Sequence, residues 1–194
     1  NDYAAYIRDS GTHLLLLVND LLDYAKHDDD AERLSFRPVS LAEVVGKAVA
    51  EARQNAEARN VSISFPSETD LTVLADPGAV QQIAANLIGN AVDHSPSGAT
   101  VEVLFSAAER AAGNADDTML VQVADRGQSL SAEEAERLLR PFEWAQADSY
   151  IADQDGGAGF GLALAHKLAE KHGSGVSLSP RSGGGMIAAF TLPL

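Results

Sequence analysis

One ten-residue stretch near the middle of the chain says most about the fold: residues 86–95 read NLIGNAVDHS. Asn86 and Asn90 are four residues apart, so in a helix both project from one face, whereas Leu87 and Ile88 belong to an apolar face. Amides are unfavourable to bury, but their neutral oxygens are hard ligands of the kind that Mg²⁺ accepts beside phosphates. A single Asn is more often a cap or an exposed helix residue. The pair at this spacing favours a binding site.

The same stretch ends an expected helix that starts at Asp76-Pro77, with the acid as N-cap and the proline in the first turn. Its wide apolar face carries Val80, Ile83, Ala84, Leu87, Ile88, Ala91 and Val92. Further helices are expected at 41–59, 132–139 and 161–171, and strands at 61–65, 71–74, 100–105, 119–124, 176–179 and 186–192. Helices and hairpin-like strand pairs follow one another without strict βαβ alternation. This order predicts an α/β fold with a mixed sheet covered by helices on one face.

A second motif places an acid at the end of an apolar strand, in residues 121–127 (VQVADRG). A carboxylate there can accept a hydrogen bond from an exocyclic amine, the group that distinguishes adenine from guanine at that ring position. An ordinary Asx turn is the commoner explanation of a lone Asp-x-Gly, and it stays open for Asp125.

A third motif is rich in glycine, in residues 156–165 (GGAGFGLALA). Gly157, Gly159 and Gly161 let backbone N–H groups approach phosphate oxygens, and the helix behind them adds its positive end. A Rossmann turn is excluded because such a turn follows a hydrophobic strand, whereas ADQD precedes this one at 152–155. No Gly-x-x-x-x-Gly-Lys-Ser/Thr occurs, which excludes a P-loop.

The N-terminal segment has the pattern of a helix that packs against another helix. Spacings of four and three residues alternate along Ile7, Gly11, Leu14, Val18, Leu21 and Ala25. Such a helix cannot bury its seam alone, which predicts a helical-bundle homodimer. The polar run at 26–30 ends the pattern, and residues 37–40 are expected to be a linker that presents Ser40 as an N-cap. The expected domains are therefore 1–37 and 38–194.

Composition narrows the classes of partner. The 194 residues carry 14 Lys and Arg against 28 Asp and Glu, a net charge of −14, which disfavours nucleic acid. There are no cysteines, which excludes a disulfide scaffold. The apolar run from Leu14 to Val18 is far shorter than the roughly 20 residues that span a bilayer. No membrane contact by this segment is expected, and its start without Met is typical of an excised fragment.

Taken in order, these motifs resemble the catalytic ATP-binding domain of bacterial sensor histidine kinases, preceded by the second helix of their dimerisation domain. The resemblance covers nearly the whole chain. It rests on residues 10–26 (second dimerisation helix), 86–95 (N box), 125–127 (first glycine box), 141–143 (F box), 157–162 (second glycine box) and 183–185 (final glycine turn).

The resemblance implies a two-layer α/β sandwich of the kind shared with gyrase and Hsp90, with ATP held under a lid at about 143–158. Asn86 and Asn90 would hold Mg²⁺ and phosphates, Asp125 the adenine amine, and the 157–161 loop the triphosphate. The full set of implied nucleotide-binding residues is Asn86, Asn90, Asp93, His94, Asp125, Gly127, Phe142, Gly157, Gly159, Gly161 and Leu162.

The implied activity is that of a protein-histidine kinase in a two-component system. The γ-phosphoryl group of ATP would pass to a histidine on the first dimerisation helix and then to an aspartate of a response regulator, in the cytoplasm, with the parent protein soluble or membrane-anchored. No histidine of this chain has the acid and Pro-Leu that follow the family's acceptor, so no catalytic residue is identified.

Three departures from the family pattern concern positive charge and backbone flexibility. Asp93 stands where the N box usually has Lys or Arg, Ser129 replaces a glycine of the first glycine box, and residues 143–158 contain no Lys or Arg. Phosphoryl transfer depends on neutralising the phosphate charge. Arg126, Arg140 and Lys167 are candidates to supply it. The alternative is a degenerate pseudokinase that keeps the fold and acts by binding a response regulator or another kinase.

Overall fold

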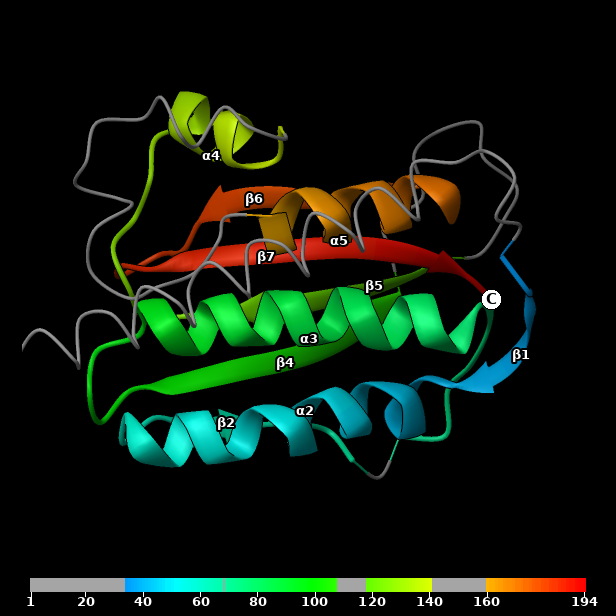
Figure 1. Cartoon of the computed structure of the whole chain (residues 1–194), viewed down its shortest axis with the longest axis horizontal. Coiled ribbons are helices and arrows are strands. Elements are labelled where there is room, and N and C mark those ends of the chain that lie inside the picture. Colours follow the sequence, from blue (N-terminus) through cyan, green and yellow to red (C-terminus); the bar gives the residue numbers. More distant parts are fainter. Residues whose placement is uncertain (1–33, 68, 108–117, 141–159) are drawn as a thin grey trace, which may run out of the picture.

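The computed structural model describes residues 34–67, 69–107, 118–140 and 160–194 of the chain (Figure 1). The expected N-terminal helix, the lid at 143–158, and Phe142, Gly157 and Gly159 lie outside these ranges.

A mixed five-stranded sheet forms one layer of the molecule. Its strands, in spatial order, are β2 (Ser62–Ser64), β4 (Thr100–Ala107), β5 (Thr118–Ala124), β7 (Met186–Pro193) and β6 (Ser177–Pro180). β2 is parallel to β4, and the other three pairings are antiparallel. The prediction of a mixed sheet is confirmed.

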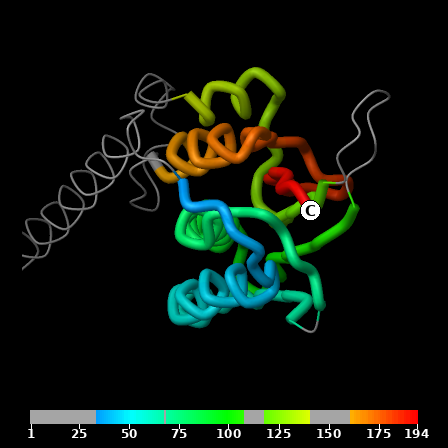
Figure 2. The backbone as a smooth tube through the Cα atoms, turned by 90° about the vertical axis from the view of Figure 1, so that its right-hand side faces the viewer, coloured from blue at the N-terminus to red at the C-terminus, as the bar shows by residue number. Residues whose placement is uncertain are grey.

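Three helices form the second layer, across one face of the sheet (Figures 1 and 2). They are α2 (Leu41–Ala58), α3 (Pro77–His94) and α5 (Phe160–Lys171), and the short helix α4 (Ala132–Leu138) lies beyond the β6 edge. The largest side chains that are fully buried come from both layers: Phe190, Leu41, Ile83, Leu87, Ile88, Leu168 and Leu192. The expected two-layer α/β sandwich is therefore confirmed.

Side-chain caps start the two long helices where the sequence predicts them. The Ser40 hydroxyl accepts from the Glu43 N–H at 3.4 Å at the start of α2. Asp76 Oδ1 accepts from the Ala79 N–H at 3.0 Å at the start of α3, and Pro77 follows it. Each cap satisfies one of the N–H groups that a helix leaves without an internal partner.

The expectation of a linker at residues 37–40 is wrong. These residues form strand β1 (Arg37–Ser40), which pairs antiparallel with β3 (Thr72–Ala75) in a separate two-stranded ribbon. Pro38 lacks an N–H and suggests a loop, but a proline is compatible with a strand that has a neighbour on only one side. Val39 is buried in the core, which gives the strand an inward face.

Candidate functional site

Four chain segments meet toward one end of the molecule, on the left in Figure 1: the second half of α3, the start of α5, the end of β5 and the turn between β6 and β7. Two close approaches join them. A Cβ added at Gly161 would lie 3.4 Å from Asn86 Oδ1, and one added at Gly127 would lie 2.4 Å from the carbonyl oxygen of His94. Residues from three separate sequence motifs are therefore neighbours.

The side-chain amide of Asn86, a partly buried residue, is unusual. Its amide nitrogen Nδ2 is buried and has no hydrogen-bond partner in the part of the chain that the structure describes. A buried donor without a partner costs about 1–3 kcal/mol, so its presence in a folded protein calls for a reason. Asn90 lies one turn further along α3 and is partly exposed. The amide nitrogens can donate to oxygen acceptors of a ligand, and the amide oxygens can bind a hard cation that comes with it.

Asp125 follows β5 directly and is 9% exposed. Its Oδ1 accepts from the N–H groups of Gly127 at 2.7 Å and Met186 at 3.1 Å. Within the described residues no hydrogen bond reaches Oδ2. Both interpretations of Asp125 are therefore compatible, because one carboxylate oxygen forms the Asx turn while the other can accept a bond from a ligand.

The turn before β7 packs against this acid, and glycine is needed there. Gly183, Gly184 and Gly185 have φ angles of 85°, 100° and 99°. Residues with a side chain rarely adopt this left-handed backbone region. A Cβ on Gly185 would also lie 2.3 Å from the carbonyl oxygen of Asp125. The glycine turn at residues 183–185 is thus part of the same site.

Asp93 contacts α2. Its Oδ1 lies 3.2 Å from Arg59 Nε and 2.9 Å from Asn55 Nδ2. Both contacts use Oδ1 and hold the Asp93 side chain against the end of α2. A role of Asp93 in nucleotide binding stays a prediction. Sequence reasoning missed Arg59, which follows α2 and carries no motif of its own.

Of the other expected site residues, the structure gives the exposure and the contacts. The His94 side chain is exposed, and it is the backbone carbonyl of this residue that contacts Gly127. Leu162 is partly buried against the core. Of the candidate cations, Arg140 follows α4 and pairs at 2.7 Å with Glu136 of that helix, and Arg126 is exposed near Gly183.

Among the helices of the described ranges, none is long and apolar enough to cross a bilayer.

Comparison with known proteins gives the family. Residues 75–194 match the family model described as histidine kinase-, DNA gyrase B- and HSP90-like ATPase. An uncharacterized sensor-like histidine kinase of Rhizobium meliloti is 35% identical over 195 residues, covering 99% of this chain and 35% of that protein. The chain therefore belongs to this ATPase family, and the resemblance stated from its motifs is confirmed.

Two solved structures share the fold. Full-length ShkA in complex with AMPPNP is 27% identical with a TM-score of 0.71, covering 99% of this chain and 38% of that one. The histidine kinase ThkA in complex with the response regulator TrrA is 20% identical with a TM-score of 0.73, covering 100% of this chain and 51% of that one. The chain spans 22% and 35% of the length of two curated relatives that it matches.

Proposed function

We propose that this chain is the Mg-ATP-binding catalytic part of a two-component sensor histidine kinase. It would transfer the γ-phosphoryl group of ATP to a histidine that the chain does not carry, and that histidine would pass it to an aspartate of a response regulator. One observation supports this most strongly: the amide nitrogen of Asn86 is buried with no hydrogen-bond partner among the described residues, and this side chain lies against Gly161 in the first turn of α5. Asp125 lies at the same end of the fold.

Asp125 would select the base. Its Oδ2 would accept a hydrogen bond from the exocyclic amine of adenine, while Oδ1 stays bonded to Gly127 and Met186. Guanine has a carbonyl at that ring position, and two acceptors facing each other cannot form a hydrogen bond.

The phosphates would lie between α3 and the start of α5. The Asn86 Nδ2 can donate to a phosphate oxygen, and the oxygens of Asn86 and Asn90 are available to a cation. Bound Mg²⁺ supplies neutralisation of the phosphate charge. The first N–H groups of α5 have no partner within the helix and add its positive end. Gly157, Gly159, Phe142 and Leu162 remain proposed contacts through the resemblance alone.

The wider role rests on the sequence. The seam at Ile7 to Ala25 supports a homodimer through an N-terminal dimerisation helix, with domains at 1–37 and 38–194. A response regulator as partner is supported by the histidine kinase relatives and by the solved complex of ThkA with TrrA. Because ATP and response regulators are cytoplasmic, we place this part of the protein in the cytoplasm.

Phosphoryl transfer tests the proposal against the pseudokinase alternative. The chain is incubated with γ-labelled Mg-ATP and a histidine-bearing dimerisation fragment from a histidine kinase relative. We expect acid-labile, base-stable label on the fragment. ATP binding without any label on the fragment would favour the pseudokinase.

The amide pair is tested by binding alone. Asn90→Ala should abolish the magnesium-dependent part of ATP binding in calorimetry, and Asn86→Ala should weaken binding with and without the metal. Gln82→Ala, an exposed amide on the same helix, is the matched control and should bind like the unmodified protein. Equal binding by all three variants would remove Asn86 and Asn90 from the site.

A further inference from the structure

Arg181 contacts a residue of β4 and the residue that follows β5, behind the candidate base-binding acid. The residue follows β6, and its NH1 donates to the backbone carbonyl of Asp125 at 3.1 Å. Its NH2 donates to the carboxylate of Glu102 in β4. Glu102 alternates with the buried residues Val101 and Val103, so this pair lies on the sheet face away from the helices. The Arg181 side chain is only 12% exposed.

The same chain segment holds Asp125 at two further points, and Ser129 in turn holds that segment. The Asp125 N–H donates to the Met186 carbonyl at 2.9 Å, and the Met186 N–H donates to Asp125 Oδ1 at 3.1 Å. The Ser129 hydroxyl donates to the Gly185 carbonyl at 3.0 Å and accepts from the Gly185 N–H at 3.1 Å. Residues 181–186 therefore fix both the backbone of Asp125 and one of its carboxylate oxygens. With Oδ1 held, the direction of Oδ2 is determined.

We propose that Arg181, oriented by Glu102, is a positioning residue for adenine selection, acting through the backbone carbonyl of Asp125. This role rests on the proposed function, and it concerns the preference of the nucleotide site for adenine, a base with an exocyclic amine. A guanidinium suits this position because its planar group can donate to a carboxylate and to a carbonyl at the same time. A lysine has one charged nitrogen and cannot reproduce that geometry.

The experiment compares two ligands that differ only in the amine. Calorimetry measures the affinity of the chain for Mg-ATP and for the Mg complex of purine riboside triphosphate, which has hydrogen in place of the 6-amino group. A hydrogen bond to a charged group corresponds to a preference of about tenfold or more for ATP in the unmodified protein. We expect Arg181→Gln to reduce that preference severalfold through weaker ATP binding, with the affinity for the purine analogue nearly unchanged.

Two variants separate positioning from general destabilisation. Glu102→Gln keeps the side-chain shape and removes the charge that orients Arg181, so it should show a smaller loss of preference and serves if Arg181→Gln does not fold. Val49→Ala removes methyl groups from the core under α2 and should lower the melting temperature while keeping the full preference. Equal loss of affinity for both ligands in Arg181→Gln and Glu102→Gln, or no change in either, would overturn the positioning role. If the unmodified protein binds neither ligand, the proposed function itself fails.

Discussion

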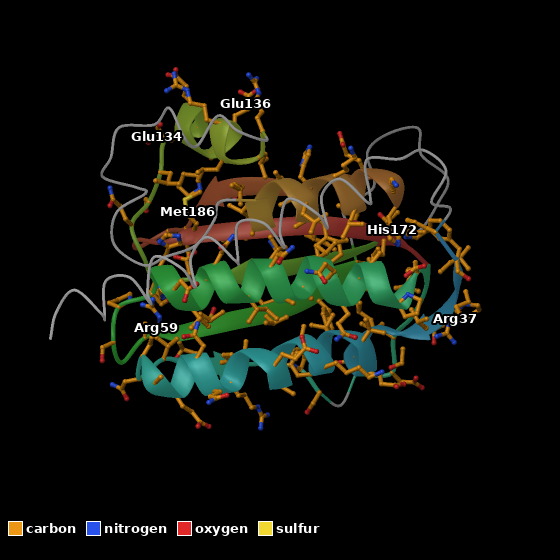
Figure 3. All side chains as sticks on the ribbon, viewed as in Figure 1. Arg37, Arg59, Glu134, Glu136, His172 and Met186 are labelled. Atoms are coloured by element: carbon orange, nitrogen blue, oxygen red, sulfur yellow. The ribbon has the colours of Figure 1, made fainter. Side chains whose placement is uncertain are left out.

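Asp93 lies in the motif at residues 86–95, but its side chain contacts other residues of the protein. It shares a helix with Asn86 and Asn90, yet its carboxylate binds Arg59 and Asn55 at the end of α2. Arg59 also donates from NH1 to the Asp93 carbonyl at 3.3 Å. Asp93 thus joins α3 to the end of α2 next to the candidate site (Figure 3, where Arg59 is labelled).

Reversing the charges of this pair tests that role. Asp93→Lys should lower the free energy of unfolding by about 1 kcal/mol, because the ion pair is lost and two cations become neighbours. The double variant Arg59→Glu with Asp93→Lys should recover most of the loss in urea unfolding. A double variant no more stable than Asp93→Lys would show that the two residues do not act as a pair.

Gly127 and Gly89 form a second matched test. A Cβ on Gly127 would lie 2.4 Å from the His94 carbonyl oxygen, so the backbone must shift, and we expect Gly127→Ala to cost about 1–3 kcal/mol in urea unfolding. A Cβ on Gly89, within α3, meets nothing within 4 Å. Gly89→Ala should therefore stabilise by about 0.4–1 kcal/mol. A neutral Gly127→Ala would contradict the close approach of β5 and α3.

The elements at the opposite end from the site are joined by polar contacts. His172, which follows α5, accepts at Nε2 from the Asp76 N–H at 3.2 Å, so its Nδ1 carries the proton and donates to the Leu168 carbonyl at 2.8 Å. Phe36 lies against the His172 ring, with centroids 5.0 Å apart. Ser35 donates its N–H to Asp76 Oδ2 at 2.8 Å. The chain entering β1 is therefore attached to α3 and α5, the helices that carry Asn86 and Gly161 (Figure 3).

Asp76 makes this attachment sensitive to pH. Partial burial alone raises the pKa of Asp76, but hydrogen bonds from Ala79, Ser35 and Gly78 bring the pKa below its ordinary value of 3.8. A carboxyl whose pKa is lower in the folded state adds stability above its unfolded pKa and loses it as pH falls through the folded value.

The expected result is a stability difference that depends on pH. Asp76→Asn should be less stable than the unmodified protein at pH 7, and the gap should close as the pH is lowered through 4 toward 3 in urea unfolding. Asp70→Asn, at an exposed acid elsewhere, controls for the change in net charge. A gap that stays constant from pH 7 to 3 would contradict a folded-state pKa below the ordinary one.

Local features of these elements could be predicted from the sequence, whereas their pairing could not. The caps at Ser40 and Asp76 and the apolar face of α3 depend on residues close in the chain. The β1–β3 pairing depends on contacts between distant segments, and Pro38 suggested a loop instead of a strand. For the same reason the motifs indicated Asn86 and Asp125, but Arg59 and Arg181 emerged only from the packing of α2 on α3 and from the strand order.

As a whole, the described molecule is a helical layer over a mixed sheet, with the candidate nucleotide residues at one end and the entering chain held at the other (Figure 1). Family membership is established by the match over residues 75–194. The low positive charge, 14 Lys and Arg against 28 Asp and Glu, is the feature that most needs a test against nucleotide binding.

Thermal unfolding with and without Mg-ATP tests most directly whether this chain binds the nucleotide despite its low positive charge. If the folded chain alone binds Mg-ATP, a hundredfold excess over the dissociation constant adds about 2.7 kcal/mol to its stability. For a domain of this size the melting temperature should then rise by about 5–11 °C, and by less without magnesium. A melting curve that does not move through millimolar Mg-ATP would contradict the account.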